Sequence, residues 1–594
     1  PLAVGGSIKN ISDMISLYNS GADKCILNQS LFNKPLLIEE AVKKFGSQAV
    51  VASLDFKEIK NNLVCYTEGD RKNTGLDLGE AIKYACELGV GEIILNCINH
   101  DGSKYGYHRE FLSFDYKKFD LPITIMGGAT ESHHFKEGLR SSGISGVAAS
   151  NIFYFTENSY PKIKKELIEQ NCFLRKFSLS ESYLSREPIY KKEFKEKLLD
   201  KLTNGKVVDK SKYNGKNLIK PIYCKRCLYP FLSASPMQID KDGVCMGCKT
   251  ADIKSKYKKE EYQRREKLLR KLTNSANNLS KNNNYDCIVS VSGGKDSYYQ
   301  THYVTKVLGL KALLVTYNGN NYSKIGWENL QNMRHQFDTD HLIFSPSIKV
   351  LKKLNKLAFV VMGDMNWHNH VGIYTTAARI AIQQKIPFIF WGEHGYADLC
   401  GQFSMDDFPE ANYRERLEHE ARGFEWNFFV GLDGITTKDM IPWQYPSDDL
   451  ILKNDLRQIF LGHYIPWESN NHLEFVIKNY NFKVSTELFE RTYRVGSNLD
   501  DIHENGIHDY LKYVKFAYGR CTDHASKDIR ANKMSREKGL ELVKKMDPIL
   551  SKDIYRWLDY VQMSMEEFIR ISDYFRDPKV WAYTKGKWIP PNRN

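Results

Sequence analysis

The sequence predicts an α/β protein in which two α/β regions are separated by a cysteine-containing segment and followed by a mainly helical region. Two observations predict this class. Residues 1–156 and 284–404 alternate short apolar strands with helical stretches, which is typical of βαβ units around a parallel sheet. The only cysteines that cluster lie between these regions, and 594 residues are enough for several domains.

Composition narrows the class further. No apolar stretch reaches the ~18 residues of a membrane span, so no membrane insertion is expected. Eight of the twelve cysteines are isolated, which is typical of a cytoplasmic protein with one metal site. The formal net charge is +13, and residues 190–220 and 251–271 supply 11 of these charges. These segments are interpreted as solvated surface, with a docking surface or a nucleic-acid patch as less favoured alternatives.

Residues 1–156 contain six strand-like runs. In order, they read PLAVGG, KCILN, AVVASLD, EIILNCI, PITIMGG and GVAAS. Amphipathic stretches such as SDMISLYNSG and LGEAIKYACELG lie between them. Two runs end in Gly-Gly and others end in Asn, Asp or Ser, which suits phosphate-binding turns at the carboxyl ends of parallel strands.

The remaining segments follow in order. Residues 157–219 are polar and lysine-rich, which indicates a basic helical linker. Residues 220–283 hold the cysteine cluster and a charged helix. Residues 284–404 begin with the strand YDCIVSV, which runs into SGGKDS and a helix before further βα units. Residues 405–594 are expected to form a mainly helical substrate and C-terminal region.

The segment SGGKDS is the strongest functional signal. It consists of Ser292, Gly293, Gly294, Lys295, Asp296 and Ser297. The glycines let the backbone fold around an anion, and the free amides and dipole of the following helix favour phosphate. Lys295 can neutralise pyrophosphate, the two serines can donate hydrogen bonds, and Asp296 can hold a Mg²⁺ ion that bridges phosphates. The spacing is not that of a Walker motif.

The clustered cysteines predict a metal site. Cys224, Cys227, Cys245 and Cys248 follow the pattern C-x2-C-x17-C-x2-C. Each pair can offer two thiolates to one ion, which indicates a tetrahedral structural Zn²⁺ site, with free thiols or an iron–sulfur cluster as alternatives. A glutaminase-like nucleophile at Cys245 is disfavoured, because the preceding QIDKDG is polar where a nucleophile elbow needs a hydrophobic strand.

Two histidine-containing segments lie in the same α/β region as SGGKDS. They are WHNH at 367–370 and WGEH at 391–394. The second ends a strand, so Glu393 and His394 are expected at the edge where open α/β sheets bind ligands. Substrate or magnesium contact and a purely structural role are both left open for these residues.

Residues 1–156 resemble the cyclase subunit of imidazole glycerol phosphate synthase. The resemblance lies in PLAVGGSI, GADKCILNQS, FGSQAVVASLD, RKNTG, GEIILNCINHDGSKYGY, PITIMGGA and GVAASNIF. It begins at the family's third strand and so implies a (β/α)8-type barrel that lacks its first two strands and the catalytic aspartate of strand one. Six strands cannot close a barrel, so we expect the chain to be truncated or to be completed by another element.

The same resemblance implies functional roles for individual residues of this sequence. The second catalytic aspartate falls on Asp55. The phosphate-binding end falls on Gly5, Gly6, Asn28, Asp101, Gly127, Gly128, Ala149 and Ser150. A charged ammonia gate falls on Lys24 and Glu92, for which an ordinary salt bridge is the alternative. Asn99 replaces a family aspartate, which leaves open whether the barrel keeps cyclase chemistry or only conducts ammonia.

Residues 220–594 resemble the N-acetyl sugar amidotransferases of bacterial surface-polysaccharide (lipopolysaccharide, O-antigen) synthesis. The resemblance lies in CKRCLYP, GVCMGC, VSVSGGKDS, the two histidine-containing segments and YGRCTDHASKDIR. SGGKDS itself is similar to the PP-loop of ATP pyrophosphatases, which implies a doubly wound, HUP-like domain that uses ATP with Mg²⁺. The catalytic residues would be Lys295, Asp296 and Glu393.

The resemblance implies conversion of an acetamido group on a nucleotide-linked sugar into an acetamidino group. A separate glutaminase subunit would supply the ammonia, since the chain itself has no room for a glutaminase domain. The main rival is a PP-loop enzyme that modifies tRNA, for which Cys287 and Cys400 are isolated catalytic candidates. A non-catalytic ammonia-conducting scaffold would not need an intact SGGKDS, and a histidine-pathway cyclase would leave residues 220–594 unexplained.

Overall fold

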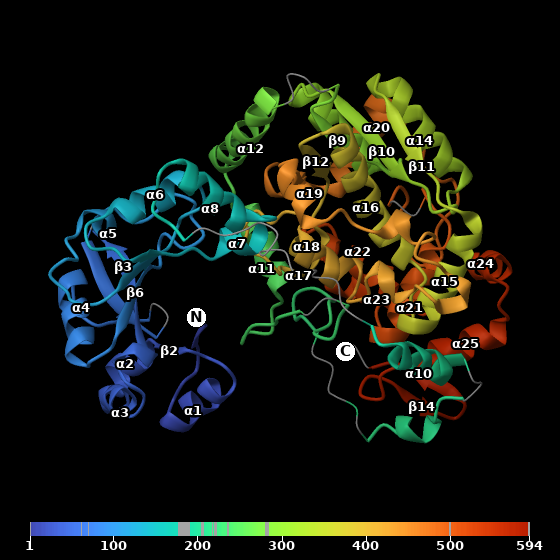
Figure 1. Ribbon diagram of the computed structural model, residues 1–594. Helices are drawn as coiled ribbons and strands as arrows, with labels where there is room; N and C mark the ends of the chain where they lie inside the picture. The colour runs from blue at the N-terminus through green and yellow to red at the C-terminus, as the bar shows by residue number, and fades with distance from the viewer. Residues whose placement is uncertain are drawn as a thin grey trace. The chain divides into compact units, whose positions relative to one another are not determined.

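The computed structural model describes residues 2–60, 62–68, 71–175, 190–203, 207–216, 218, 223–234, 237–279, 284–497 and 500–591. The chain divides into two compact units, Pro1–Ser182 and Tyr183–Asn594 (Figure 1). Within the described residues, no helix is both long and apolar enough to cross a bilayer.

The first unit is built on a parallel sheet. Its strands are β1 (Ala3–Gly5), β2 (Lys24–Leu27), β3 (Val50–Ile59), β6 (Glu92–Cys97), β7 (Ile123–Met126) and β8 (Gly146–Val147). They neighbour one another in this order and are all parallel. The six predicted strands are therefore confirmed, and the sheet fits part of a TIM-like barrel.

Helices connect these strands and cover the sheet. They are α1 (Ile11–Asn19), α2 (Gln29–Asn33), α3 (Pro35–Phe45), α4 (Leu78–Glu87), α5 (Arg109–Ser113), α6 (Ser132–Arg140), α7 (Asn151–Phe155) and α8 (Ser159–Glu169). Helices α1 and α4 each begin with a capping box, formed by Asn10 with Asp13 and by Asp77 with Glu80. Helices α3 and α4 pack against β3, and their apolar faces join the buried core of this unit (Figure 1).

One element of the first unit differs from the sequence prediction. Strand β3 continues beyond the parallel sheet and pairs antiparallel with β4 (Asn62–Thr67), which pairs in turn with β5 (Lys72–Asn73). In β4, buried residues alternate with more exposed ones, as expected for a strand with one covered face. This extension carries residues 57–59 of β3 past the carboxyl edge of the parallel sheet.

The second unit contains a five-stranded parallel sheet. Its strands are β9 (Cys287–Ser290), β10 (Ala312–Tyr317), β11 (His341–Phe344), β12 (Phe388–Trp391) and β13 (Arg457–Phe460). Their order is β11-β10-β9-β12-β13, so the strand order reverses between β9 and β12. In doubly wound sheets, ligands bind at this switch point, outside the carboxyl ends of the strands. Strand β13 is not predicted, because it lies in the region from residue 405 where the sequence indicates mainly helix.

Both faces of this sheet are buried. One face packs against α13 (Lys295–His302), α14 (Lys324–Phe337) and α20 (Ser469–Tyr480), and the other against α16 (Trp367–Gln384). The further helices of the unit are α10 (Lys192–Thr203), α11 (Met246–Ser255), α12 (Lys259–Leu279), α15 (Ile348–Met362), α17 (Gly395–Cys400), α18 (Tyr413–Glu415), α19 (Asp448–Lys453), α21 (Asn505–Phe516), α22 (Arg520–Arg530), α23 (Arg536–Met546), α24 (Asp553–Val561) and α25 (Met565–Tyr574). Strands β14 (Ala582–Thr584) and β15 (Lys587–Ile589) form a terminal hairpin.

Candidate functional site

The SGGKDS loop joins β9 to α13 through a tight turn. The Ser292 N–H donates to Ser297 Oγ at 3.0 Å, and the Gly294 N–H donates to Ser292 Oγ at 3.2 Å. Gly293 has a φ of +85°, and a Cβ there would lie 2.9 Å from the backbone N of Leu330. Only glycine fits this position without a shift of α14. The loop therefore closes at the start of a helix, where free amides favour an anion.

The two charged residues of the loop contact each other. Lys295 Nζ lies 2.9 Å from Asp296 Oδ2, and Lys295 is almost fully buried. The other carboxylate oxygen of Asp296 lies 3.0 Å from Nδ1 of His472, whose ring stacks on Tyr299 at 3.8 Å. His472 comes from α20, far along the chain, and no sequence motif marks it.

Glu393 follows β12 and so lies on the other side of the switch point. Its Oε1 accepts a hydrogen bond of 2.6 Å from Nζ of Lys527 on α22. Burial lowers the pKa of Lys527, but the carboxylates of Glu393, Asp398 and Asp296 outweigh this effect and raise it overall. Lys527 thus stays protonated and is influenced by acidic residues from both loops. It belongs to YGRCTDHASKDIR, a segment that resembles the N-acetyl sugar amidotransferases but for which no residue role is predicted from the sequence.

Asp501 adds a buried carboxyl group near the loop. Burial raises its pKa to about 7, although a hydrogen bond with Ser292 and the charge of Lys295 act in the opposite direction. Its Oδ1 has no hydrogen-bond partner within the described residues. The sequence contains no motif that marks this residue.

Of the histidines in the two predicted segments, His368 and His394 are buried, whereas His370 is partly exposed. His368 lies in the core between Tyr317 OH at 3.1 Å and Asn355 Nδ2 at 2.9 Å, and burial lowers its pKa to about 3. His394 caps α17, and burial lowers its pKa to about 3 as well. His370 Nδ1 lies 3.2 Å from Glu420 Oε2 at the wall of a cavity.

Two cavities meet at Glu393, with volumes of about 540 Å³ and about 420 Å³. The larger one is rich in charged groups and aromatic rings, among them Lys512, Lys515, Arg520, Asp523, Tyr396 and Tyr518. Asp523 is buried there, and its Oδ1 has no partner among the described residues. The smaller cavity is lined by Trp467, Arg494, Lys527 and Asp528 among others. Both cavities are therefore lined by charged and aromatic side chains, and they share Glu393.

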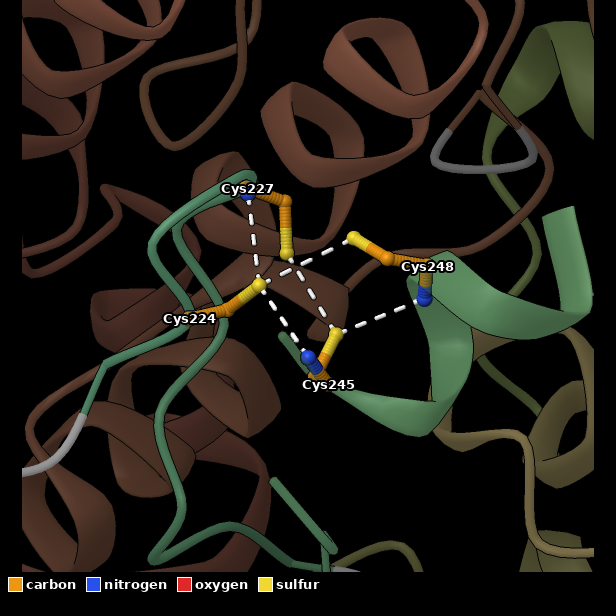
Figure 2. A group of neighbouring side chains, drawn as sticks. All are labelled: Cys224, Cys227, Cys245 and Cys248. Atoms are coloured by element: carbon orange, nitrogen blue, oxygen red, sulfur yellow. Dashed lines mark hydrogen bonds between the residues drawn. The ribbon is translucent and has the colours of Figure 1, made fainter. Parts of the chain in front are cut away.

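The four cysteines converge on one point (Figure 2). Cys224 and Cys227 lie on one loop, and Cys245 and Cys248 lie at the start of α11. The Sγ atoms of Cys224 and Cys248, and those of Cys227 and Cys245, are 3.7 Å apart, and all four lie within 4.8 Å of one another. Tetrahedral Zn²⁺ with Zn–S bonds of about 2.3 Å requires sulfur separations of about 3.8 Å. The donor set therefore fits the predicted ion.

Hydrogen-bond donors surround these sulfur atoms. Backbone N–H groups of Cys245 and Cys248 lie 3.3 Å from Cys224 Sγ and 3.4 Å from Cys245 Sγ. Nη2 of Arg530 lies 3.6 Å from Cys227 Sγ and 3.4 Å from Cys245 Sγ. These donors favour thiolates. Arg530 and Lys527 stand on the same helix, α22, which thus contacts both the cysteine cluster and Glu393.

Cys245 does not have the setting of a nucleophile elbow. The segment before it forms only an isolated bridge between Ile239 and Cys245, and its sulfur faces the other cysteines. The sequence-based preference for a metal ligand over a nucleophile agrees with this geometry.

In the first unit, some of the predicted site residues come together around Asp55. Gly5, Gly6, Asn28 and Asp55 all line one cavity of about 640 Å³. Asn28 Nδ2 donates to Asp55 Oδ2 at 3.0 Å, and Asn96 Nδ2 donates to Asp55 Oδ1 at 3.1 Å. Burial raises the pKa of Asp55 in spite of these hydrogen bonds.

The remaining predicted residues of this unit fall at two places. Asp101, Gly127, Gly128, Ala149 and Ser150 lie after the carboxyl ends of β6, β7 and β8. A Cβ at Gly128, whose φ is +88°, would lie 2.3 Å from the carbonyl oxygen of Gly106, so this turn requires glycine. Lys24 and Glu92 form an ion pair at the opposite edge, where β2 and β6 begin.

Comparison with known proteins finds matches at both ends of the chain. Residues 1–159 match the family "Histidine biosynthesis protein", and residues 474–590 match "LPS biosynthesis protein WbpG-like, C-terminal domain". The latter segment contains Asp501, Lys527 and Arg530.

Curated relatives match part of the chain. "Imidazole glycerol phosphate synthase subunit HisF" of Bacteroides fragilis is 36% identical over 175 residues, which cover 30% of this chain and 70% of that protein. HisF of Hydrogenobaculum sp. is 36% identical over 176 residues with the same shares, and HisF of Wolinella succinogenes is 38% identical over 177 residues, 30% of this chain and 69% of that protein. With the parallel sheet of the first unit, these matches show that the chain belongs, through its N-terminal region, to the family of imidazole glycerol phosphate synthase subunit HisF.

Proposed function

We propose that the protein is an ATP-dependent amidotransferase of surface-polysaccharide biosynthesis. Its acceptor is the acetamido group of a nucleotide-linked sugar, which becomes an acetamidino group. One observation carries the proposal: the SGGKDS loop after β9 and Glu393 after β12 flank the switch point of a doubly wound sheet. The match of residues 474–590 to an LPS biosynthesis family supports the polysaccharide context.

The first step activates the amide. An amide carbon is a poor target for ammonia, because its oxygen is a poor leaving group. The amide oxygen attacks the α-phosphorus of ATP and pyrophosphate departs, which leaves AMP bonded to that oxygen. In this proposal, amides of the SGGKDS loop and Lys295 hold the phosphates, and Asp296 would hold a Mg²⁺ ion, which would supply charge neutralisation. The proposed role of Lys527 is to stabilise negative charge at the transferred phosphoryl group, which its contact with Glu393 and the influence of Asp296 support.

In the second step, ammonia adds to the activated carbon. Its nitrogen forms the new C–N bond, the C–O bond to AMP breaks, and a proton leaves the nitrogen to give the amidine. The carboxylate of Glu393 is the proposed acceptor of that proton, because it lies where the two cavities meet.

The source of ammonia follows from the HisF relationship. We propose a separate glutaminase subunit that delivers ammonia to the barrel past Lys24 and Glu92. Asp55 and the phosphate-binding positions keep a ligand site on the opposite edge of the barrel. The cysteine cluster binds Zn²⁺ for a structural purpose, because four thiolates leave no open coordination position for chemistry.

The test uses the full-length chain with ATP, ammonium and a panel of nucleotide-linked acetamido sugars. The expected result is AMP formation that depends on the sugar, together with a product in which NH replaces O, identified by mass spectrometry. Asp296→Asn should abolish AMP formation, while exposed Asp559→Asn should leave it intact.

Two outcomes would contradict the proposal. Turnover of tRNA without turnover of any sugar would favour the tRNA-modifying alternative. AMP formation that survives in both Ser292→Ala and Asp296→Asn would remove SGGKDS from the active site.

A further inference from the structure

A second group of metal-binding side chains lies in the first unit, far in sequence from the cysteines. It consists of Glu58, His100 and His108, whose ligand atoms lie within 4.8 Å of one another. Glu58 stands on the extension of β3, and the two histidines stand on the segment between β6 and α5. Two imidazoles with one carboxylate form a donor set that suits divalent transition metals such as zinc, iron, cobalt and nickel.

His100 is oriented for ligation. Its Nδ1 lies 2.9 Å from the carbonyl oxygen of Gly106. A carbonyl oxygen only accepts hydrogen bonds, so Nδ1 carries the ring proton and Nε2 keeps its lone pair. This is the arrangement in which metal-binding histidines are commonly held, with the second nitrogen bonded to a backbone carbonyl.

His108 and Glu58 already approach each other. Nε2 of His108 lies 3.6 Å from Oε2 of Glu58. Nδ1 of His108 accepts a long hydrogen bond of 3.3 Å from the N–H of Glu110, so the Nε2 proton lies between the imidazole and the carboxylate. A bound cation would take the place of the proton on Nε2 of His108. The neutral ring would then carry its proton on Nδ1, and the long hydrogen bond from Glu110 would be lost.

The backbone around the three residues is fixed, whereas one ligand remains adjustable. The N–H of Glu58 donates to Asn99 Oδ1 at 2.7 Å, which ties the β3 extension to the loop after β6. The Glu58 side chain is 36% exposed and the His108 side chain 10%. Metal bonds of 2.0–2.2 Å bring ligand atoms to about 3.0–3.4 Å from one another, and rotation of the half-exposed Glu58 can close this gap.

We propose that Glu58, His100 and His108 form a second metal site that binds a divalent first-row transition ion and leaves coordination positions open to solvent or to an anionic ligand. The site lies next to Asp101 and on the same edge of the sheet as Asp55. It is independent of the proposed amidotransferase reaction, which uses the other unit of the chain.

The test measures metal stoichiometry and cobalt spectra of the full-length chain. After chelation and re-addition of Zn²⁺, two equivalents per chain are expected, one at the cysteines and one at the new site. With Co²⁺, the cysteine site gives intense sulfur-to-cobalt charge-transfer bands, whereas the new site gives only weak d–d bands. His108→Ala and the more conservative Glu58→Gln should each lose one equivalent without loss of the charge-transfer bands.

Matched variants keep the test decisive. His133→Ala, an exposed histidine of the same unit, should keep two equivalents, and Cys248→Ser should lose the charge-transfer bands while it keeps the weak d–d bands. One equivalent in the wild-type chain would overturn the proposal. So would two equivalents in folded His108→Ala and Glu58→Gln, or an equal loss in His133→Ala.

Discussion

Lys527 contacts Glu393, and the charge of Asp296 also acts on it, so it relates to both loops of the candidate active site. Replacement of Lys527 by Gln should lower kcat for AMP formation by about 10²-fold, because a positioned cation next to the transferred phosphate is lost. Glu393 would also lose its 2.6 Å partner. Initial rates at saturating ATP and ammonium measure the effect, with Lys538→Gln on α23 as an exposed control. Equal rates in the two variants would exclude a role of Lys527 in catalysis.

The raised pKa of Asp501 predicts how the stability of the folded chain depends on pH. Its folded-state pKa is about 7, above the ordinary carboxyl value of about 3.9. Between these values the folded chain binds more protons than the unfolded chain, so stability falls as pH rises from about 4 to about 7. Asp501→Asn should remove this slope and be more stable than the wild type at pH 8, by at most about 4 kcal/mol.

Thermal unfolding between pH 5 and pH 8 tests this expectation. The gain in stability of Asp501→Asn over the wild type should become smaller toward pH 5. Exposed Asp559→Asn should have the same stability as the wild type at every pH. A constant difference between Asp501→Asn and the wild type across this range would contradict the pKa assigned to Asp501.

At the scale of elements, helix α22 joins two sites. Arg530 donates toward two cysteine sulfurs and to the carbonyl oxygen of Leu399 at 2.9 Å. Loss of such a partner typically weakens metal affinity 10–100-fold. Arg530→Met should therefore release Zn²⁺ to a chromogenic chelator faster, by about tenfold or more. Arg530→Lys should release Zn²⁺ at an intermediate rate, because lysine keeps the positive charge but lacks the planar guanidinium group with its several N–H donors.

The control for this experiment is Lys544→Met on α23. If Arg530→Met and Lys544→Met release zinc at the same rate, the guanidinium group does not stabilise the thiolates. A slower AMP-forming reaction in Arg530→Met at full zinc occupancy would show that α22 also transmits the change to Lys527.

At the scale of the whole molecule, the proposed ammonia route predicts a difference between two nitrogen sources. Lys24→Gln removes one half of the ion pair at the start of β2 and β6. We expect it to reduce glutamine-driven amidine formation with a glutaminase subunit several-fold and to leave ammonium-driven formation unchanged. Exposed Lys83→Gln serves as the control. Equal loss with both nitrogen sources would assign Lys24 to stability instead of ammonia transfer.

The sequence predicts those parts of the molecule whose signal lies within a short stretch of the chain. The six strands of the first unit are apolar runs that end in glycine or a polar residue, and Ser292–Ser297 and the cysteine pairs are contiguous or regularly spaced. By contrast, β13 is only four residues long and follows helical segments. His472, Asp501 and Lys527 reach the site only through tertiary packing, so no spacing in the chain reveals them.

Because β13 lies far beyond β12 in the chain, the parallel sheet of the second unit is completed late during synthesis. Residues 392–456 separate β13 from its neighbour β12, and it pairs with β12 through residues 457–460. At synthesis rates of about 5–20 residues per second, the edge of β12 stays unpaired for several seconds after β12 leaves the ribosome. A fragment that ends at residue 404 would keep that edge open permanently and should aggregate. Expression of this chain in pieces therefore has to include β13 together with β9, β10, β11 and β12.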